Sequence, residues 1–300
     1  MPCSPIIRRN FWLRRPRAEP AMLARDLLYQ SAKKLTLAGS DAPRLNADLL
    51  LMHAWNCSRA ELINRGLQEI PAGIKIHFDS LLERRLKREP LAYILGEKEF
   101  WSRRFQVTPD VLIPRPETEH LIEAVLKYLP DRMAPYQFCD IGTGSGCIAI
   151  TLACEYPHAH VIATDVSPAA LEIAKRNAEL HGVDKRMTFL LGNMLQPLSE
   201  QHTDLDAVIS NPPYVTLAEM DELDEELAFE PRHALTDEAD GLGFLQQLAD
   251  GASAYLKNDA YLLLETGPCG LPTPPAGLVM LEALPDLAGH LRGVVYQRIT

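Results

Sequence analysis

Residues 138–146 read Phe138-Cys139-Asp140-Ile141-Gly142-Thr143-Gly144-Ser145-Gly146. A short apolar run here ends in three glycines with the spacing GxGxG, a pattern typical of a strand that turns into a helix. Glycine at such a turn lets the backbone approach a ligand closely and adopt conformations that other residues resist. A dinucleotide fingerprint would need its third glycine or alanine at position 147, where this chain has Cys147. We therefore expect Gly142, Thr143, Gly144, Ser145 and Gly146 to bind a cofactor.

The chain beyond this loop alternates short apolar strands with helices. Strands are expected at 137–141, 161–165, 188–191 and 205–210, and helices from Cys147 onward and over 168–181. Such alternation predicts an α/β fold, with a doubly wound parallel sheet covered by helices on both faces. Ligands of this architecture bind at the carboxyl ends of the strands.

Asp165 ends the second expected strand, 23 positions after Gly142. A carboxylate at this place can accept hydrogen bonds from both hydroxyls of a ribose. It can equally cap the helix expected from Pro168, so Asp165 alone leaves both roles open. Together with the glycine loop, the position favours ribose binding.

The fourth expected strand runs directly into Asn211-Pro212-Pro213-Tyr214. The two prolines remove backbone donors and fix the loop, so that Asn211 Oδ1 and the Pro212 carbonyl can accept hydrogen bonds from a substrate NH2 group. Tyr214 can pack on a flat group and fix its plane. A rigid turn with Asn211 as a local cap would explain the residue types but not the complete motif. The motif predicts an S-adenosylmethionine-dependent methyltransferase that acts on a planar amide or amino nitrogen, with Asn211, Pro212 and Tyr214 as the catalytic residues.

Asn193 and Met194 follow the third expected strand, where methyltransferases of this architecture contact adenine. Asn193 suits the exocyclic amine, and Met194 suits the face of the ring. A methionine here can instead fill a gap in the core. Both residues are predicted to bind the cofactor, together with Asn211.

Four segments are expected along the chain. They are a disordered basic extension at 1–21, a helical substrate-docking domain at 22–89, a β-hairpin linker at 90–116 and the methyltransferase domain at 117–300. Within the second segment, Ser58 is placed to cap a helix. Tyr93 and Ile94 lie in β-like runs of the linker. The first segment is either a basic arm or sequence upstream of a start at Met22, and the second interpretation is favoured.

The composition excludes several classes of protein. No run approaches the roughly eighteen apolar residues of a membrane span. The six cysteines include no CxxC pair and do not cluster with histidines. This pattern disfavours a structural zinc site, any other metal centre and a disulfide framework. It also indicates a reducing, cytoplasmic environment. The net charge is −10, and residues 211–240 contribute −9 of it, from ten acids and one base. This balance argues against a surface that holds nucleic-acid phosphates, and the acidic segment is either a solvated helix face or a rim that attracts a basic protein.

The chain resembles a known family, the HemK-type glutamine methyltransferases, and among them those that modify release factors. The similarity covers about 22–292 and depends on six stretches. They are Leu91-Ala92-Tyr93-Ile94-Leu95-Gly96, Glu99-Phe100-Trp101, Ile113-Pro114-Arg115-Pro116-Glu117-Thr118-Glu119, the glycine loop DIGTGSG, NPPY at 211–214 and Asp286-Leu287-Ala288-Gly289. The stretch from Ile113 to Glu119 distinguishes this family from other methyltransferases.

The resemblance implies a Rossmann-like class I methyltransferase sheet with a small N-terminal all-α domain. It also implies N5-methylation of the glutamine in the Gly-Gly-Gln motif of class I peptide-chain release factors. Cofactor contacts are implied at 142–146, Asp165, Met194 and Asn211, and contacts with the substrate glutamine from Asn211 to Tyr214. We expect a monomer that uses neither a membrane nor nucleic acid directly.

The chain departs from the family pattern in two places. Family members usually have Asp where this chain has Asn193, and often an aromatic residue at Met194. They also place a helix after the strand that matches 261–265, whereas the proline-rich segment 268–275 cannot form one. We therefore expect a loop there and a final antiparallel pair of strands at about 278–283 and 294–299.

Two other kinds of methyltransferase, which act on other substrates, are compatible with parts of the sequence pattern. An adenine-N6 DNA methyltransferase also uses NPPY, but it needs a basic target-recognition surface, which the charge of 211–240 opposes. A ribosomal-protein glutamine methyltransferase of the same family would share the fold and chemistry, and the stretch from Ile113 to Glu119 argues against it.

Overall fold

The computed structural model describes residues 22–220, 222–286 and 288–300. The basic extension expected at 1–21 lies outside these residues. The chain divides into two compact units, one that ends at Leu86 and one that runs from Lys87 to Thr300. None of the helices in the described ranges is long and apolar enough to cross a membrane.

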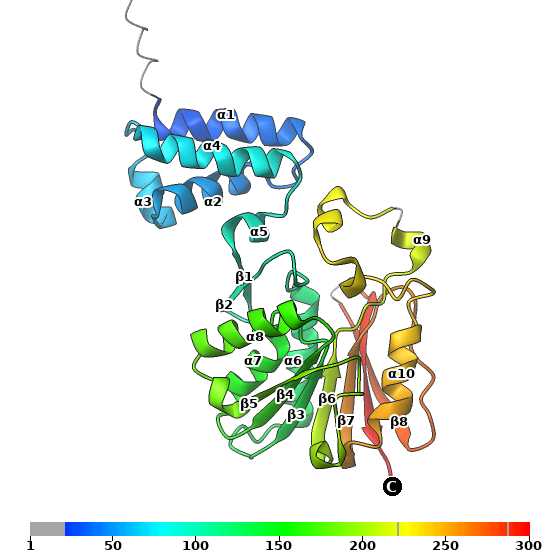
Figure 1. Cartoon of the computed structure of the whole chain (residues 1–300). Helices are drawn as coiled ribbons and strands as arrows, with labels where there is room; N and C mark the ends of the chain where they lie inside the picture. The colour runs from blue at the N-terminus through cyan, green and yellow to red at the C-terminus, as the bar shows by residue number, and fades with distance from the viewer. Residues whose placement is uncertain (1–21, 221, 287) are drawn as a thin grey trace, which may run out of the picture. The chain divides into compact units, whose positions relative to one another are not determined.

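The first unit is all-helical (Figure 1). Its helices are α1 (Ala24–Leu37), α2 (Pro43–Trp55), α3 (Arg59–Asn64) and α4 (Ala72–Leu86). Leu28, Leu50 and Phe78, from three of these helices, are buried in its core. Ser58 caps α3 as predicted: its Oγ accepts from Glu61 N at 3.3 Å, and its own N–H donates to Glu61 Oε2 at 2.8 Å.

The second unit begins with a helix where a strand was predicted. Residues Leu91–Leu95 form α5, between Pro90 at the N-cap and Gly96, whose φ of 75° ends the helix. The β-like interpretation of Tyr93 and Ile94 was wrong, because one helical turn buries both side chains and lets Tyr93 Oη donate to the carbonyl of Val111 at 2.6 Å. The predicted hairpin follows as β1 (Glu97–Phe100) and β2 (Arg103–Gln106).

A sheet of seven strands forms the main part of the second unit (Figure 1). The strands are β3 (Gln137–Ile141), β4 (His160–Asp165), β5 (Met187–Leu191), β6 (Leu205–Ser210), β7 (Leu256–Glu265), β8 (Leu278–Pro285) and β9 (Leu291–Arg298). Their order is β5-β4-β3-β6-β7-β9-β8, and the first five are parallel. β9 runs antiparallel to both β7 and β8, which confirms the predicted final pair.

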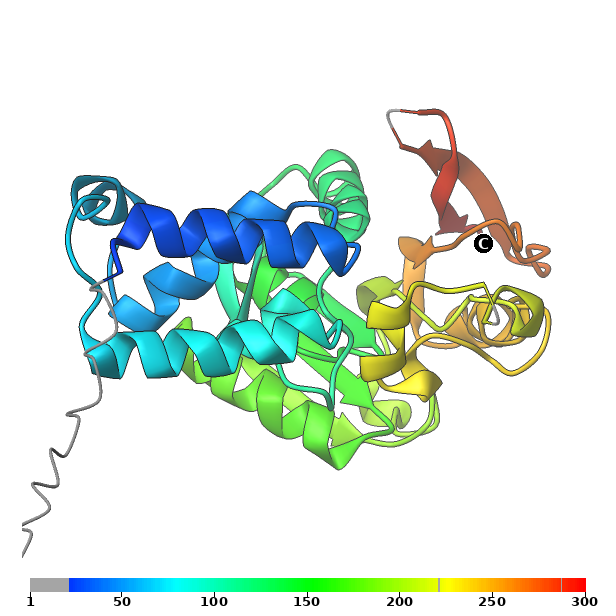
Figure 2. The same cartoon turned by 90° about the horizontal axis from the view of Figure 1, so that it is seen from above.

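Helices cover both faces of this sheet, as the alternation of elements predicted (Figure 1 and Figure 2). One face packs on α6 (Glu119–Tyr128), α7 (Cys147–Glu155) and α8 (Pro168–Leu180), and the other packs on α10 (Gly243–Ala252). Successive residues of a strand point to opposite faces, so Phe138 joins the first core and Cys139 the second. The α/β fold with a doubly wound sheet is therefore confirmed.

The segment that joins β7 to β8 contains no helix, as its prolines predicted. The loop is held in place by hydrogen bonds instead. Tyr296 Oη, on β9, donates to the Pro272 carbonyl at 2.7 Å, and Thr273 N donates to Gln246 Oε1, on α10, at 2.9 Å.

The remaining elements surround the carboxyl ends of the parallel strands or connect them. They are the 3-10 helices η1 (Pro116–Thr118), η2 (Asp184–Arg186), η3 (Glu200–His202), η4 (Glu225–Phe229) and η5 (Arg232–Ala234), and the short helix α9 (Leu217–Met220).

Candidate active site

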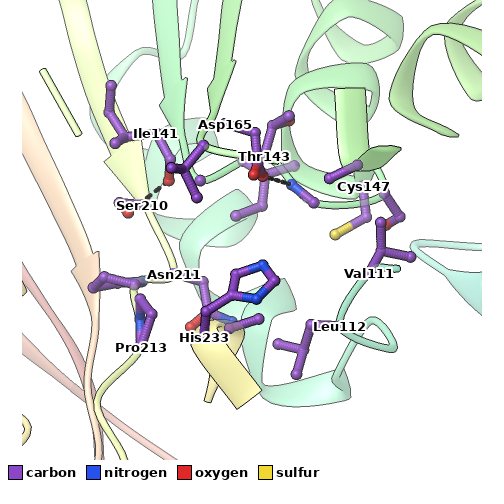
Figure 3. A pocket seen from close by; sticks show the side chains of 18 of the residues that line it. Val111, Leu112, Ile141, Thr143, Cys147, Asp165, Ser210, Asn211, Pro213 and His233 are labelled. Carbon is purple, nitrogen blue, oxygen red and sulfur yellow. Dashed lines mark hydrogen bonds between the residues drawn. The ribbon is translucent and has the colours of Figure 1, made fainter. Parts of the chain in front are cut away.

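A cavity opens at the carboxyl ends of β3, β4, β5 and β6, within the second unit. Its wall includes the glycine loop on one side and the Asn211 loop on the other (Figure 3). The segment before η1 and the residues of η5, including His233, complete the wall. This is the edge of the sheet at which doubly wound folds bind their ligands.

The glycine loop owes its shape to backbone conformations that favour glycine. Gly142, Gly144 and Gly146 have φ values of 71°, 55° and 83°. A Cβ on Gly142 or Gly144 would meet nothing within 4 Å, whereas one on Gly146 would lie 2.7 Å from Ile150 Cδ1. The first two glycines therefore leave room beside the cavity, and the third allows α7 to pack closely against α8.

Asp140, on β3, holds this loop in place by hydrogen bonds. Its Oδ2 accepts hydrogen bonds from Thr143 Oγ1 at 2.7 Å and from Ala149 N at 3.2 Å, while Oδ1 is buried without a partner among the described residues. Burial raises the pKa of Asp140 to about 7, although the bonds from Thr143 and Ala149 act to lower it.

Asp165 lines the cavity at the end of β4 and is 8% exposed. Its Oδ2 accepts from Gly144 N and its Oδ1 from Ser167 N, both at 2.9 Å. Ser167, and not Asp165, is the N-cap of α8, since Ser167 Oγ accepts from Ala170 N. Each carboxylate oxygen keeps a lone pair for a further donor, as ribose binding requires.

Gly192, Asn193 and Met194 line the cavity after β5. Asn193 is exposed and Met194 half-buried, with Met194 also packed against the second core. Met194 has a φ of 52°, a backbone conformation that few non-glycine residues adopt. The structure thus brings both residues to the same cavity as the glycine loop and Asp165.

Asn211 lies across the cavity from the glycine loop (Figure 3). Its Nδ2 donates to Thr118 Oγ1 at 3.1 Å. One N–H of the amide is engaged there, and Oδ1 is the acceptor of the side chain that has no partner among the described residues. Pro212 and Pro213 line the cavity next to it.

Tyr214 is placed differently from its three neighbours, since it does not line the cavity. Its Oη donates to Glu265 Oε1, at the end of β7, at 2.9 Å. A Cβ on Gly267 would lie 2.9 Å from Tyr214 Cδ2, so this glycine makes room for the ring. Burial and the adjacent Glu265 carboxylate raise the pKa of Tyr214, which keeps it a neutral donor.

One acid of the negatively charged segment is buried instead of solvated. Glu230 is 7% exposed, and its Oε1 accepts from Arg115 at 2.5 Å while its Oε2 accepts from Ile113 N at 3.0 Å. Glu230 therefore fastens the stretch before η1 to the segment after β6. This stretch contributes Pro114 and Arg115 to the cavity wall.

The sequence did not predict the roles of Thr118, Glu230 and Glu265, whose hydrogen bonds hold the segments around the cavity in place. The stretch from Ile113 to Glu119 was noticed only as a mark of the family, although it contains the hydroxyl that binds Asn211. Glu265 had a clear signal, since it is a single acid at the end of the apolar run 261–265. An acid in that position is costly to bury unless it has a partner.

Two family models match the chain. The PrmC N-terminal domain matches residues 26–96, and the methyltransferase small domain matches residues 119–241. A release factor glutamine methyltransferase of Neisseria gonorrhoeae is 43% identical, over 83% of this chain and 92% of the relative. The chain belongs to the release factor glutamine methyltransferase family. Another family member, from Koribacter versatilis, is 38% identical over 93% of this chain and 100% of its own.

Family membership makes the chain a methyltransferase of the class I, Rossmann-like fold, as the sequence predicted. Among solved structures, a putative methyltransferase of Escherichia coli is similar with a TM-score of 0.47 and 18% identity, over 66% of this chain and 93% of that one.

Proposed function

We propose that this chain transfers a methyl group from S-adenosylmethionine to the side-chain amide nitrogen of a glutamine, in the Gly-Gly-Gln motif of class I peptide-chain release factors. The supporting observation is the orientation of Asn211. Its Nδ2 is held by Thr118 at 3.1 Å, so Oδ1 is available as an acceptor beside the rigid Pro212 carbonyl. Two oxygen acceptors suit the two hydrogens of a substrate NH2 group.

The residues around the cavity are compatible with S-adenosylmethionine as the methyl donor. Gly142 and Gly144 leave open space where side chains would lie, and Asp165 retains acceptor capacity on both oxygens. We propose that the cofactor is held by 142–146, Asp165, Asn193, Met194 and Asn211. When bound, it supplies an electrophilic methyl group on a sulfonium.

The chemical task of the protein is to make an amide nitrogen reactive. The nitrogen is a weak nucleophile because its lone pair is delocalised into the carbonyl group. Asn211 Oδ1 and the Pro212 carbonyl, by accepting its two N–H groups, raise the electron density on nitrogen and stabilise the positive charge that develops there. They also fix the direction of attack, so no nucleophilic side chain is needed.

We propose a protein substrate for two reasons. The curated relatives are named for release factors and match this chain over most of its length. In addition, residues 211–240 contribute a charge of −9, which repels the phosphates of DNA and attracts a basic protein. On this account the enzyme acts in the cytoplasm as a monomer, without a membrane or direct contact with nucleic acid.

Mass spectrometry of the substrate tests this proposal. A class I release factor is incubated with the enzyme and S-adenosylmethionine, and the peptide with the Gly-Gly-Gln motif is sequenced. We expect the added mass of one methyl group on the glutamine, and none on a release factor in which that glutamine is replaced by asparagine.

Two parallel incubations test the alternative substrates. One contains an adenine-bearing DNA duplex and the other contains ribosomal proteins. Methyl transfer to either, with an unmodified Gly-Gly-Gln peptide, would show that the proposed substrate is wrong.

A further inference from the structure

His233, on η5, presents to the cavity a polar side chain that the mechanism described so far does not use. Figure 3 shows its imidazole extending into the cavity from the side on which Asn211 lies. The ring nitrogens have no hydrogen-bond partner among the described residues. An imidazole carries at least one ring N–H whether it is neutral or protonated, so His233 offers the cavity a free donor.

The turn that carries His233 is fastened on both sides of this residue. Three positions before it, the buried Glu230 accepts from Ile113 N at 3.0 Å. Two positions after it, the Leu235 carbonyl accepts from Val215 N at 2.9 Å. Val215 directly follows the NPPY motif in the chain. The backbone of His233 is therefore held at a fixed place relative to the acceptors of that motif.

A substrate carboxamide brings two kinds of polar group into the cavity. Its NH2 group is accepted by Asn211 Oδ1 and the Pro212 carbonyl in the mechanism proposed above. Its carbonyl oxygen also leaves water on entry and needs a donor, because an acceptor that is buried without a partner weakens binding. Pro212 and Pro213 have no N–H, so the middle of the Asn211 loop cannot supply this donor.

Several other donors of the cavity wall are engaged elsewhere. Thr143 and Ser210 each donate a hydroxyl hydrogen to a group on β3, at 2.7 Å. Arg115 donates from Nη2 to Glu230 at 2.5 Å. His233, by contrast, has a free ring N–H on the side of the cavity where the Asn211 loop lies.

We propose that His233 is a substrate-contacting residue, whose ring N–H donates to the carbonyl oxygen of the substrate carboxamide while Asn211 Oδ1 and the Pro212 carbonyl accept from its NH2 group. This role rests on the glutamine methylation proposed above. The three groups together recognise both ends of a carboxamide. An amine without a carbonyl group satisfies only the two acceptors, and a carboxylate satisfies only His233.

The contact with His233 strengthens the binding of the substrate and does not assist the chemical step. In the bound amide, the lone pair of the nitrogen is delocalised onto the carbonyl oxygen, which makes this oxygen a good acceptor. As the nitrogen attacks the methyl group, the delocalisation is lost and the oxygen becomes a poorer acceptor. Loss of the hydrogen bond therefore raises the KM for the release factor without lowering kcat.

The test compares two substitutions of His233. His233→Phe keeps a flat ring but removes both nitrogens, whereas His233→Gln keeps an N–H donor. For His233→Phe we expect the KM for the release factor to rise about 10-fold, with a kcat within about 2-fold of that of the unaltered enzyme. His233→Gln should rescue binding, with a KM within about 3-fold of that of the unaltered enzyme.

His202 provides a matched control. It lies on η3 and does not line the cavity. The substitution His202→Phe makes the same chemical change at this position and should alter neither KM nor kcat. The Kd for S-adenosylmethionine, measured by calorimetry, should be the same in all variants, because His233 is assigned to the substrate and not to the cofactor.

A binding measurement without methyl transfer isolates the contact. Calorimetry gives the Kd of the release factor for the unaltered enzyme and for His233→Phe, both loaded with S-adenosylhomocysteine. Each enzyme is measured with a release factor that carries the glutamine of the Gly-Gly-Gln motif and with one that carries leucine in its place. Leucine removes the carboxamide, so His233→Phe should weaken binding about 10-fold for the glutamine form and should leave the leucine form unaffected.

The results separate this proposal from the proposed function. If the unaltered enzyme leaves the release factor unmethylated, glutamine methylation is wrong and the role of His233 is wrong with it. If the unaltered enzyme methylates the release factor but His233→Phe keeps the same KM, or lowers kcat as much as it raises KM, only the role of His233 is overturned. Equal weakening of binding for the glutamine and leucine forms would also overturn that role, since His233 would then contact another part of the substrate.

Discussion

Asn211 shows what sequence can and cannot predict about a single residue. Its position after an apolar strand and before two prolines indicated an acceptor for an NH2 group. Which end of the amide faces the cavity depends on Thr118, which is 93 positions away in the chain. The residues next to Asn211 in the sequence do not reveal its contact with Thr118. The hydrogen bond between Tyr214 and Glu265, which are also far apart in the chain, cannot be predicted from the neighbouring sequence either.

Two buried carboxyls should make the ligand-free protein less stable as the pH rises. Burial raises the pKa of Asp140 from 3.8 to about 7 and that of Glu265 from 4.5 to about 7. The folded state therefore holds protons that the unfolded state loses, and stability declines from about pH 4 until both groups are ionised above pH 7. Between pH 6 and pH 8 we expect a loss of about 1 kcal/mol for each group, measured by urea unfolding.

The control for this prediction is the double variant Asp140→Asn and Glu265→Gln, which cannot ionise at these positions. Its free energy of unfolding should change less between pH 6 and pH 8 than that of the unaltered protein. An identical change in both proteins would contradict the assignment of the two carboxyls.

At the level of elements, the strands were the most predictable part. The runs at 137–141 and 205–210 match β3 and β6 because strands covered on both faces are largely apolar. The error at α5 has a physical cause, since five apolar residues between Pro90 and Gly96 fit either a strand or one helical turn. Only the packing of Tyr93 against Val111 distinguishes the two.

Two substitutions in the glycine loop should affect different properties, one the binding of the cofactor and the other the stability of the protein. Gly144→Ala adds a methyl group in open space beside the cavity, so it should weaken binding of S-adenosylmethionine by about 10-fold or more, measured by calorimetry. Gly146→Ala places its methyl group 2.7 Å from Ile150 Cδ1 and 3.2 Å from Ala174 Cβ. It should lower the free energy of unfolding by about 1–3 kcal/mol more than Gly144→Ala.

Alanine at either position must adopt a positive φ, and this cost is common to the two variants. The difference between their free energies of unfolding therefore reports the contacts of the added methyl group. Equal losses of stability in the two variants, or tight cofactor binding by Gly144→Ala, would show that the loop does not work in this way.

At the scale of the whole molecule, sequence predicted the α/β class, the parallel order of elements and the final antiparallel pair. It did not predict how segments far apart in the chain are fastened around the cavity. The acids of 211–240 were interpreted as a solvated face or a rim, yet Glu230 is buried against Arg115 and Ile113. The net charge of this segment does not show which of its ten acids is buried.

Glu230 should contribute more to stability than an exposed acid of the same segment. Glu230→Gln removes the charge that pairs with Arg115 but keeps an acceptor for Ile113 N, and we expect a loss of about 2 kcal/mol in urea unfolding. Glu238 pairs with Arg232 at 2.6 Å on the surface, and Glu238→Gln should leave stability unchanged. Similar effects of the two substitutions would argue against a fastening role for Glu230.

The central claim is that Asn211 accelerates methyl transfer by accepting the substrate amide. The most direct measurement is the single-turnover rate of methylation of the Gly-Gly-Gln glutamine by the unaltered enzyme and by Asn211→Ala, both saturated with S-adenosylmethionine. We predict that Asn211→Ala lowers this rate by about 10²-fold or more. A rate equal to that of the unaltered enzyme would contradict the account.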